Sequence, residues 1–234
     1  MLKIMKLEFK KHHLSQYIKG VAMWTLIIFA AVALMAWGSR NEIEPMFSNY
    51  ADFMSLANIF IKIVFITFSA VVLSRLVIDE YKNKTILLLF SYPLQRKKLI
   101  LAKLSIVLIF CFTSIVVSTF VINLLVYWLH LHLFLFEHAV QINEIFSTMP
   151  SVLIQAAMTA GVSLIPLYFG MRKKSTATTI TWAVIIGVLI NATVSKGGEQ
   201  VSLNQIIIIP SILCLFGLFI GYLAFRKVDK IDVA

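Results

Sequence analysis

Long apolar stretches separated by short charged ones are the main pattern of this 234-residue chain. Each stretch comes close to the roughly 20 residues that a helix needs to cross about 30 Å of hydrocarbon. They are nearly continuous, whereas the strands of a membrane barrel are short and alternating, so we expect helices. The pattern predicts an all-α membrane protein, a single domain over residues 1–234, with six transmembrane helices. These run approximately over Val21 to Trp37, Leu56 to Ile78, Leu99 to Leu129, Ser151 to Gly170, Thr176 to Val194 and Ile206 to Phe225.

Composition agrees with this pattern. Hydrophobic residues make up 60% of the chain and charged residues 14%, against roughly 45 to 50% and about 25% in soluble proteins. The connections between the apolar stretches are short, which leaves no room for a soluble domain.

The basic residues predict the orientation, because Lys and Arg in short loops stay in the cytoplasm. With both termini inside, the inner segments hold 16 of the 21 Lys and Arg residues, and the outer loops hold only Arg40 and Lys196. This asymmetry, together with attraction to anionic lipid, accounts for the net charge of +10. We therefore expect the lipid bilayer as a partner and no nucleic acid.

Residues 1–19 predict an amphipathic helix that lies in the inner membrane interface. Apolar and basic residues recur at steps of three and four, as on two faces of a helix. Such a helix buries its apolar face among acyl chains and turns its lysines toward lipid phosphate. The apolar set is Ile4, Leu7, Leu14 and Ile18, and the basic set is Lys3, Lys6, Lys10 and His13.

The chain lacks the residues that a self-powered transporter or a membrane enzyme needs. All eleven acidic residues lie in predicted loops or tails or, for Asp52, near the outer end of a span, so none can carry protons through the bilayer. There is no P-loop motif, no HExxH motif and no serine with a base at span depth. The histidines near residue 130 do not fix a set of metal ligands. We expect no catalytic residue, metal or cofactor in this chain.

Lys62 is the only charge that the pattern places well inside a span. An ammonium at that depth costs about 2.5 to 3.5 kcal/mol, so Lys62 binds an anionic or carboxylate-bearing substrate, snorkels outward, or donates hydrogen bonds to neighbouring carbonyls. Gln155 and Thr159 stand four residues apart on the fourth span, where Pro166 opens the backbone. They line a substrate path with Lys62 or form hydrogen bonds between helices.

Gly217 and Gly221 form a G-x-x-x-G pattern in the last span, which permits close helix approach. The pattern fits packing within the subunit and packing between subunits equally well.

The segment from Asp79 to Lys98 combines charged ends with the apolar run Ile86 to Phe90. Its charges keep it out of the bilayer, and its apolar centre needs cover. A short helix between the inner membrane surface and a protein partner meets both demands. Thr85 caps such a helix, Pro93 ends it and Arg96 marks the return into the membrane.

This segment resembles permease subunits of the second major class of bacterial ABC exporters, which includes bacitracin-resistance, lantibiotic-immunity, drug-efflux and polysaccharide-export permeases. The similarity extends to the six-span order, the basic N-terminus and the chain length. Lys84 departs from the pattern, because it stands where these permeases usually have glycine. The residues that match the E-x-x-x-G-T, L-x-x-x-x-P-x-x-R and trailing K pattern are Glu80, Thr85, Leu88, Pro93, Arg96 and Lys103.

The resemblance implies a multi-pass permease of the bacterial plasma membrane. It pairs with a second permease subunit, identical or related, and with two ABC ATPase subunits that bind ATP and Mg. It moves an amphipathic peptide, antibiotic or lipid-like substrate outward. A secondary transporter and a membrane enzyme or assembly factor without an ATPase remain as alternatives. The residues implied in ATPase coupling are Glu80, Thr85, Leu88, Phe90, Pro93 and Arg96.

Overall fold

The computed structural model describes residues 2–11, 15–39, 50–83, 96–133, 142–196, 199–202 and 208–227. These residues are helical apart from one β-hairpin near the C-terminal helix. The elements are α1 (Leu2–Lys11), α2 (Ser15–Gly38), α3 (Tyr50–Leu73), a π-helical segment (Ser74–Ile78), α4 (Asp79–Lys82), α6 (Arg96–Leu133), α7 (Ile142–Val162), α8 (Pro166–Lys173), α9 (Thr176–Ile190), β1 (Thr193–Lys196), β2 (Glu199–Ser202) and α10 (Ile208–Lys227).

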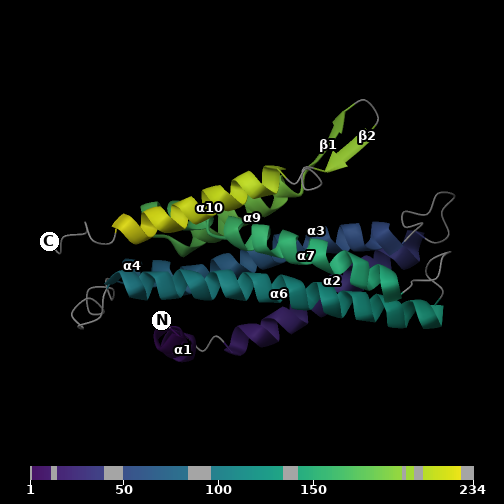
Figure 1. Ribbon diagram of the computed structural model, residues 1–234, viewed down its shortest axis with the longest axis horizontal. Coiled ribbons are helices and arrows are strands. Elements are labelled where there is room, and N and C mark those ends of the chain that lie inside the picture. The colour runs from purple at the N-terminus through teal and green to yellow at the C-terminus, as the bar shows by residue number, and fades with distance from the viewer. Residues whose placement is uncertain are drawn as a thin grey trace.

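The long helices lie side by side in an elongated bundle (Figure 1). Helix α1 and the C-terminal end of α10 lie at the same end of the bundle, as do α4 and the start of α6. The hairpin lies at the opposite end. The structure therefore places the base of the segment between α4 and α6 beside α1.

Within the described residues, four stretches are long and apolar enough to cross a membrane: Gln16–Gly38, Tyr50–Lys82, Lys98–Leu129 and Ile145–Lys173. Two further apolar helices, Thr176–Ile190 and Ile208–Ala224, are shorter. The predicted helical membrane fold is thus confirmed, and four of the six predicted spans reach full length. Helix α6 has 38 residues, which at 1.5 Å per residue is about 57 Å and exceeds the hydrocarbon thickness.

The strands were not expected from the sequence, which predicted only a short connection between the apolar stretches that end at Val194 and begin at Ile206. Strands β1 and β2 pair antiparallel, with Thr193 opposite Ser202 and Lys196 opposite Glu199. Each strand has four residues, which is too short to give a clear alternating pattern in the sequence.

The predicted fourth span contains a break. Helix α7 ends at Val162 and α8 starts at Pro166, which has no N–H to donate. The backbone between them tightens, with the Leu164 N–H donating to the Gly161 carbonyl at 3.2 Å and the Ile165 N–H to the Val162 carbonyl at 2.9 Å. The expectation that Pro166 opens this backbone agrees with the break.

Helices α7 and α10 approach each other closely at glycines. A Cβ placed on Gly217 would collide with the carbonyl of Gly161, and one placed on Gly161 would lie 3.2 Å from the Cα of Cys214. A Cβ on Gly221 would lie 3.2 Å from Cδ1 of Leu164. The G-x-x-x-G pattern of α10 therefore faces α7 of the same subunit.

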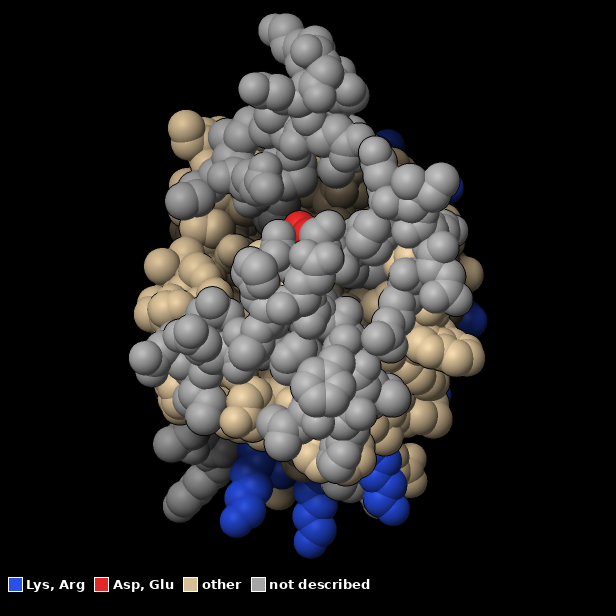
Figure 2. All heavy atoms as spheres, turned by 90° about the vertical axis from the view of Figure 1, so that its right-hand side faces the viewer, with Lys and Arg blue, Asp and Glu red and all other residues tan. Residues whose placement is uncertain are grey.

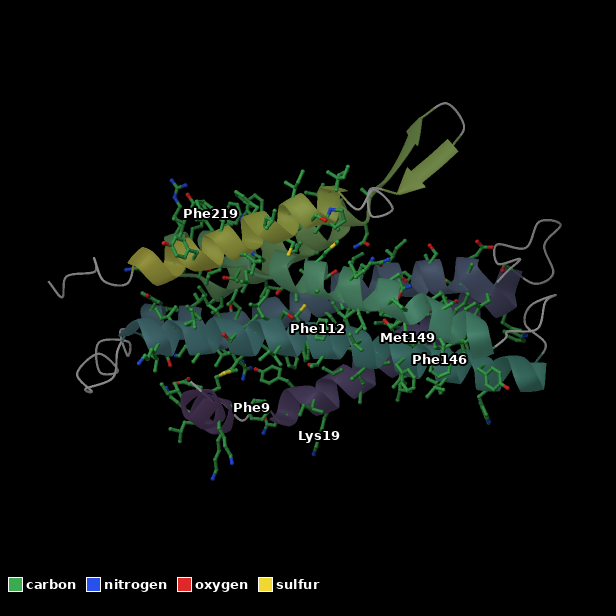
Figure 3. All side chains as sticks on the ribbon, viewed as in Figure 1. Phe9, Lys19, Phe112, Phe146, Met149 and Phe219 are labelled. Carbon is green, nitrogen blue, oxygen red and sulfur yellow. The ribbon has the colours of Figure 1, made fainter. Side chains whose placement is uncertain are left out.

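Two clusters of buried apolar side chains lie along the bundle. One surrounds Leu73, Leu76 and Ile78 at the end that carries α1, and the other surrounds Phe53 and Phe65. Large apolar side chains also cover the outside, including Phe146 and Phe219 (Figure 3), which are 65% and 55% exposed. An apolar exterior over an apolar interior is what a bilayer requires.

Candidate functional site

Three parts of the chain meet at a buried group of charges near the base of the segment 79–98. Helix α3 continues into the π-helical segment Ser74–Ile78, in which the Asp79 N–H donates to the carbonyl of Ser74. Helix α4 follows and carries Glu80, whose side chain is buried. Short π-helical segments are often found at functional sites. This one ends at the residue before the predicted coupling segment.

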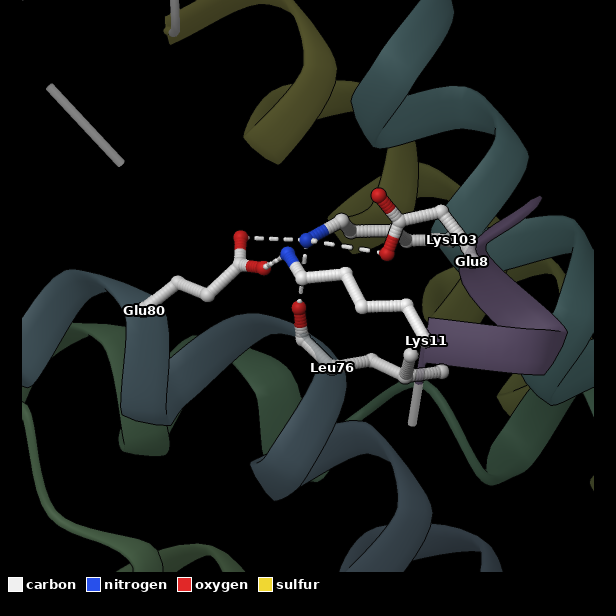
Figure 4. A network of polar contacts seen from close by, with 5 residues as sticks. All are labelled: Glu8, Lys11, Leu76, Glu80 and Lys103. Carbon is white, nitrogen blue, oxygen red and sulfur yellow. Dashed lines mark hydrogen bonds and ion pairs between the residues drawn. The ribbon is translucent and has the colours of Figure 1, made fainter. Parts of the chain in front are cut away.

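Lys103, on the second turn of α6, is the centre of this group (Figure 4). It is 1% exposed, and its ammonium donates to the Leu76 carbonyl at 2.9 Å and to Oε2 of Glu80. Oε2 of Glu8 lies 3.6 Å from the same nitrogen, which is an ion-pair distance and too long for a direct hydrogen bond. An ammonium has three protons, and three acceptors from three elements surround this one.

Helix α1 contributes two of the charged side chains. Glu8 is 5% exposed and faces Lys103, while Lys11 is half-exposed and donates to Oε1 of Glu80 at 3.0 Å. The two residues are three positions apart and so share one face of the helix. Met5 of the same helix packs against the apolar cluster around Leu76. One face of α1 is thus docked on the protein.

We call these groups the Lys103 cluster: Glu8, Lys11, the Leu76 carbonyl, Glu80 and Lys103. Its two carboxylates and two ammonium groups balance in charge. Buried ions need such partners, because desolvation costs several kcal/mol per ion unless geometry and hydrogen bonds repay it. Lys11 is about half in solvent, so its pair with Glu80 contributes little to stability, about 0 to 1 kcal/mol. The buried contacts to Lys103 carry most of the interaction.

A second buried lysine lies farther along the bundle. Lys62 on α3 is 4% exposed, and its ammonium donates to Oε1 of Gln155 on α7 at 2.7 Å. Thr159, one turn after Gln155, is buried and donates its hydroxyl to the Gln155 carbonyl at 2.7 Å. The structure therefore brings together Lys62 and Gln155 of the predicted substrate path, with Thr159 one turn farther along α7. It also supports the alternative, because Lys62 and Gln155 form a hydrogen bond between helices.

The predicted coupling residues are only partly within the described structure. Glu80 is buried in the Lys103 cluster, and Arg96 is the first residue of α6. Thr85, Leu88, Phe90 and Pro93 lie outside the described residues. Of the predicted coupling residues, Glu80 is thus the one whose described side chain pairs with other elements, through Lys11 and Lys103.

Sequence reasoning missed the part that α1 plays. The sequence placed Glu8 among the acidic residues of loops and tails, whereas the structure buries it against Lys103. One signal was present in the sequence. Lys103 lies near the start of an apolar span and needs an acidic partner, and Glu80 alone does not accept from all three protons of the Lys103 ammonium.

Charge is distributed unevenly between the two ends of the bundle. Figure 2 views the end away from α1, where acidic atoms of the described residues are visible near the centre and Lys and Arg lie at the edges of the view. The exposed lysines Lys6, Lys10 and Lys19 belong to the region of α1 and the start of α2, and Lys19 points away from the bundle (Figure 3). Among the described residues, the end that carries α1 is thus the basic end.

Comparisons with known proteins identify the family of the chain. Residues 4–191 match the family of ABC-2 family transporter proteins. The chain is similar to the uncharacterized protein YcbO of Bacillus subtilis (strain 168), with 34% identity over 231 residues, covering 99% of this chain and 100% of that protein. No solved structure matches the chain.

Both matches extend over most of the chain, including α1, the Lys103 cluster and the Lys62 pair. Together with the four membrane-length stretches among the described residues, they identify a multi-pass protein of the bacterial plasma membrane and a transport subunit. The chain belongs to the ABC-2 family of transporter proteins, as a membrane permease subunit of an ABC transporter.

Proposed function

We propose that this chain is the permease of an ATP-driven exporter that moves an amphipathic peptide, antibiotic or lipid-like substrate outward. It works with a second permease subunit and two ATPase subunits, which bind ATP and Mg. Its six spans, the two shorter helices α9 and α10 included, leave both termini in the cytoplasm. The family membership supports an ATPase partner, and the apolar spans are consistent with an amphipathic cargo.

The coupling segment, residues 79–98, is the part that we propose to dock on the ATPase. The observation that carries this proposal is the construction of its base. The helix before the segment provides Glu80 and the helix after it provides Lys103, and the two side chains form a buried ion pair. We call the π-helical segment with α4, and the start of α6, the two stems of the coupling segment. A loop that is fixed at both stems can pass movement to the helices α3 and α6 that hold it.

A substitution in the apolar centre of the segment tests this proposal. Replacing Leu88 by Asp places a charge where the segment meets its partner, so the ABC ATPase should no longer co-purify or should hydrolyse ATP without export. Lys82→Ala, at an exposed position on α4, is the control and should retain the ATPase. Wild-type export by Leu88→Asp would refute the docking role.

Lys62, Gln155 and Thr159 form the proposed substrate path. What supports this role is that Lys62 is buried at span depth with an amide oxygen, a neutral group, as its acceptor, so an anionic substrate group would bind there more strongly. Lys62→Arg should keep export of an anionic cargo and Lys62→Met should lose it, with ATPase binding unchanged in both. Equal export by the two variants would place Lys62 outside the path.

A further inference from the structure

Both stems of the coupling segment converge on one ammonium group. Glu80 and the Leu76 carbonyl belong to the stem before the segment, and Lys103 belongs to the stem after it, 23 positions from Glu80. These contacts are directional, because the ammonium donates one hydrogen bond to the Leu76 carbonyl and one to Glu80. They fix the distance between the stems and also their orientation.

Helix α1 is tied to the same point. Its Glu8 approaches Lys103 and its Lys11 donates to Glu80, so α1 contacts both stems through charges of opposite sign. Figure 4 shows the side chains arriving from α1, from the end of α3 with α4, and from α6. The position of α1 and the position of the coupling segment are thereby linked.

A buried glutamate is not what membrane anchoring requires. An interfacial helix needs an apolar face and exposed lysines, and an acidic residue is repelled by anionic lipid. Glu8 is 5% exposed and faces the protein. Its charge serves contact with the permease, while Lys6, Leu7 and Lys10 remain exposed for the membrane.

Nor is the Lys103 cluster needed for stability alone. It lies beside an apolar cluster that contains Leu76, Ile78 and Leu104, where apolar side chains would pack at no desolvation cost. Replacing buried ions by well-packed apolar residues is often neutral or stabilising, whereas ions fix a particular arrangement. The cluster is therefore better suited to defining position than to holding the fold together.

We propose that Glu8 and Lys103 are positioning residues for ATPase coupling. Through them α1 and the two stems of the coupling segment form one unit, and α1 moves with the segment during transport. This inference rests on the proposed function, which assigns the coupling role to residues 79–98. It adds that the membrane-surface helix takes part in transmission and is more than an anchor.

Hydrogen–deuterium exchange on the full chain in lipid nanodiscs tests the proposal without the ATPase. In Glu8→Gln, peptides covering residues 79–98 should exchange about tenfold faster, because local opening costs less once α1 no longer holds the base. Lys10→Met, two positions along the same helix and exposed, should exchange like the wild type. If Glu8→Gln does not fold, Lys11→Met, which removes the contact to Glu80, should give a smaller increase in the same peptides.

A titration with the partner ABC ATPase provides the functional readout. Glu8→Gln should raise the ATPase concentration that gives half-maximal complex by about tenfold and leave the maximal hydrolysis rate of the complex near that of the wild type. A purely structural role would lower the unfolding midpoint without changing the exchange of residues 79–98 or this half-saturation.

Each result of the two experiments decides something. Unchanged exchange and unchanged half-saturation in Glu8→Gln would overturn the positioning role while leaving the proposed function intact. A wild-type chain that does not bind the ATPase would refute the proposed function, and the exchange comparison would still decide whether α1 holds the segment.

Discussion

Lys103 and Lys62 are two buried lysines on neighbouring apolar helices, and they differ in the groups that surround their ammonium charges. Lys103 lies between two carboxylates and a backbone carbonyl, whereas the described contacts of Lys62 include one amide oxygen. A lysine whose charge is balanced by fixed partners holds structure in place. A lysine that keeps a net charge at span depth is suited to binding an anion. The comparison separates a positioning site from a candidate binding site.

The largest effect should follow the loss of Lys103. Lys103→Met leaves Glu8 and Glu80 facing each other without their shared cation, and breaking a buried ion pair in this way costs about 3 to 5 kcal/mol of folding free energy. Chemical unfolding in mixed micelles measures this loss. Lys98→Met, on the same helix at an exposed position, should change the free energy by less than about 0.5 kcal/mol. A Lys103→Met protein as stable as Lys98→Met would remove the basis of the comparison.

A variant that changes packing but no charge gives a reference for the loss of folding free energy in Lys103→Met. Gly217→Ala places a Cβ against the Gly161 carbonyl, and such overpacking typically costs about 1 to 3 kcal/mol. At Gly38, no atom lies within 4 Å of the position that a Cβ would take, so Gly38→Ala should be neutral or slightly stabilising. Equal unfolding midpoints for the two variants would contradict the close approach of α7 and α10.

Loss of Lys62 should act in the opposite direction to loss of Lys103. Lys62→Met removes a charge whose insertion costs about 2.5 to 3.5 kcal/mol but leaves the Gln155 amide oxygen without its donor, at about 1 to 3 kcal/mol. The net change should lie between about 0.5 kcal/mol against the folded state and about 2.5 kcal/mol in its favour, so stabilisation is the expected direction. The same unfolding assay checks it, and a strong destabilisation would mean that Lys62 is a structural lysine like Lys103.

The smallest effect should come from Lys11. Because its side chain is 49% exposed, Lys11→Met should cost about 0 to 1 kcal/mol, and less at high salt. Comparison with Lys10→Met isolates the contact to Glu80. A loss as large as that of Lys103→Met would show that the partly exposed pair, and not the buried one, holds α1.

The sequence predicts well what depends on local pattern. Long apolar runs were sufficient for the helical membrane fold, and the motif around Glu80 and Lys103 was sufficient for the resemblance that the family match supports. Lys62 and Gln155 were selected one by one as polar residues in spans. That they touch each other is tertiary information, since 93 positions separate them.

What the sequence could not predict depends on contacts between distant elements. The burial of Glu8 follows from α1 docking against α6. Helical periodicity alone gave α1 a lipid face and a basic face, and it gave no sign of a third face that contacts the protein. By contrast, the break between α7 and α8 could be predicted, because Pro166 has no backbone N–H to donate. The β1–β2 pairing depends on register across a turn, which short polar strands specify only weakly.

The sidedness of the coupling segment is the most direct test of the whole account. A single cysteine at Asn83, an exposed residue just after α4, is introduced with Cys111→Ser and Cys214→Ser and treated with a membrane-impermeant maleimide. The account predicts labelling in inside-out vesicles, none in intact cells, and slower labelling once the ABC ATPase is bound. Labelling from outside intact cells, or a rate that bound ATPase leaves unchanged, would contradict it.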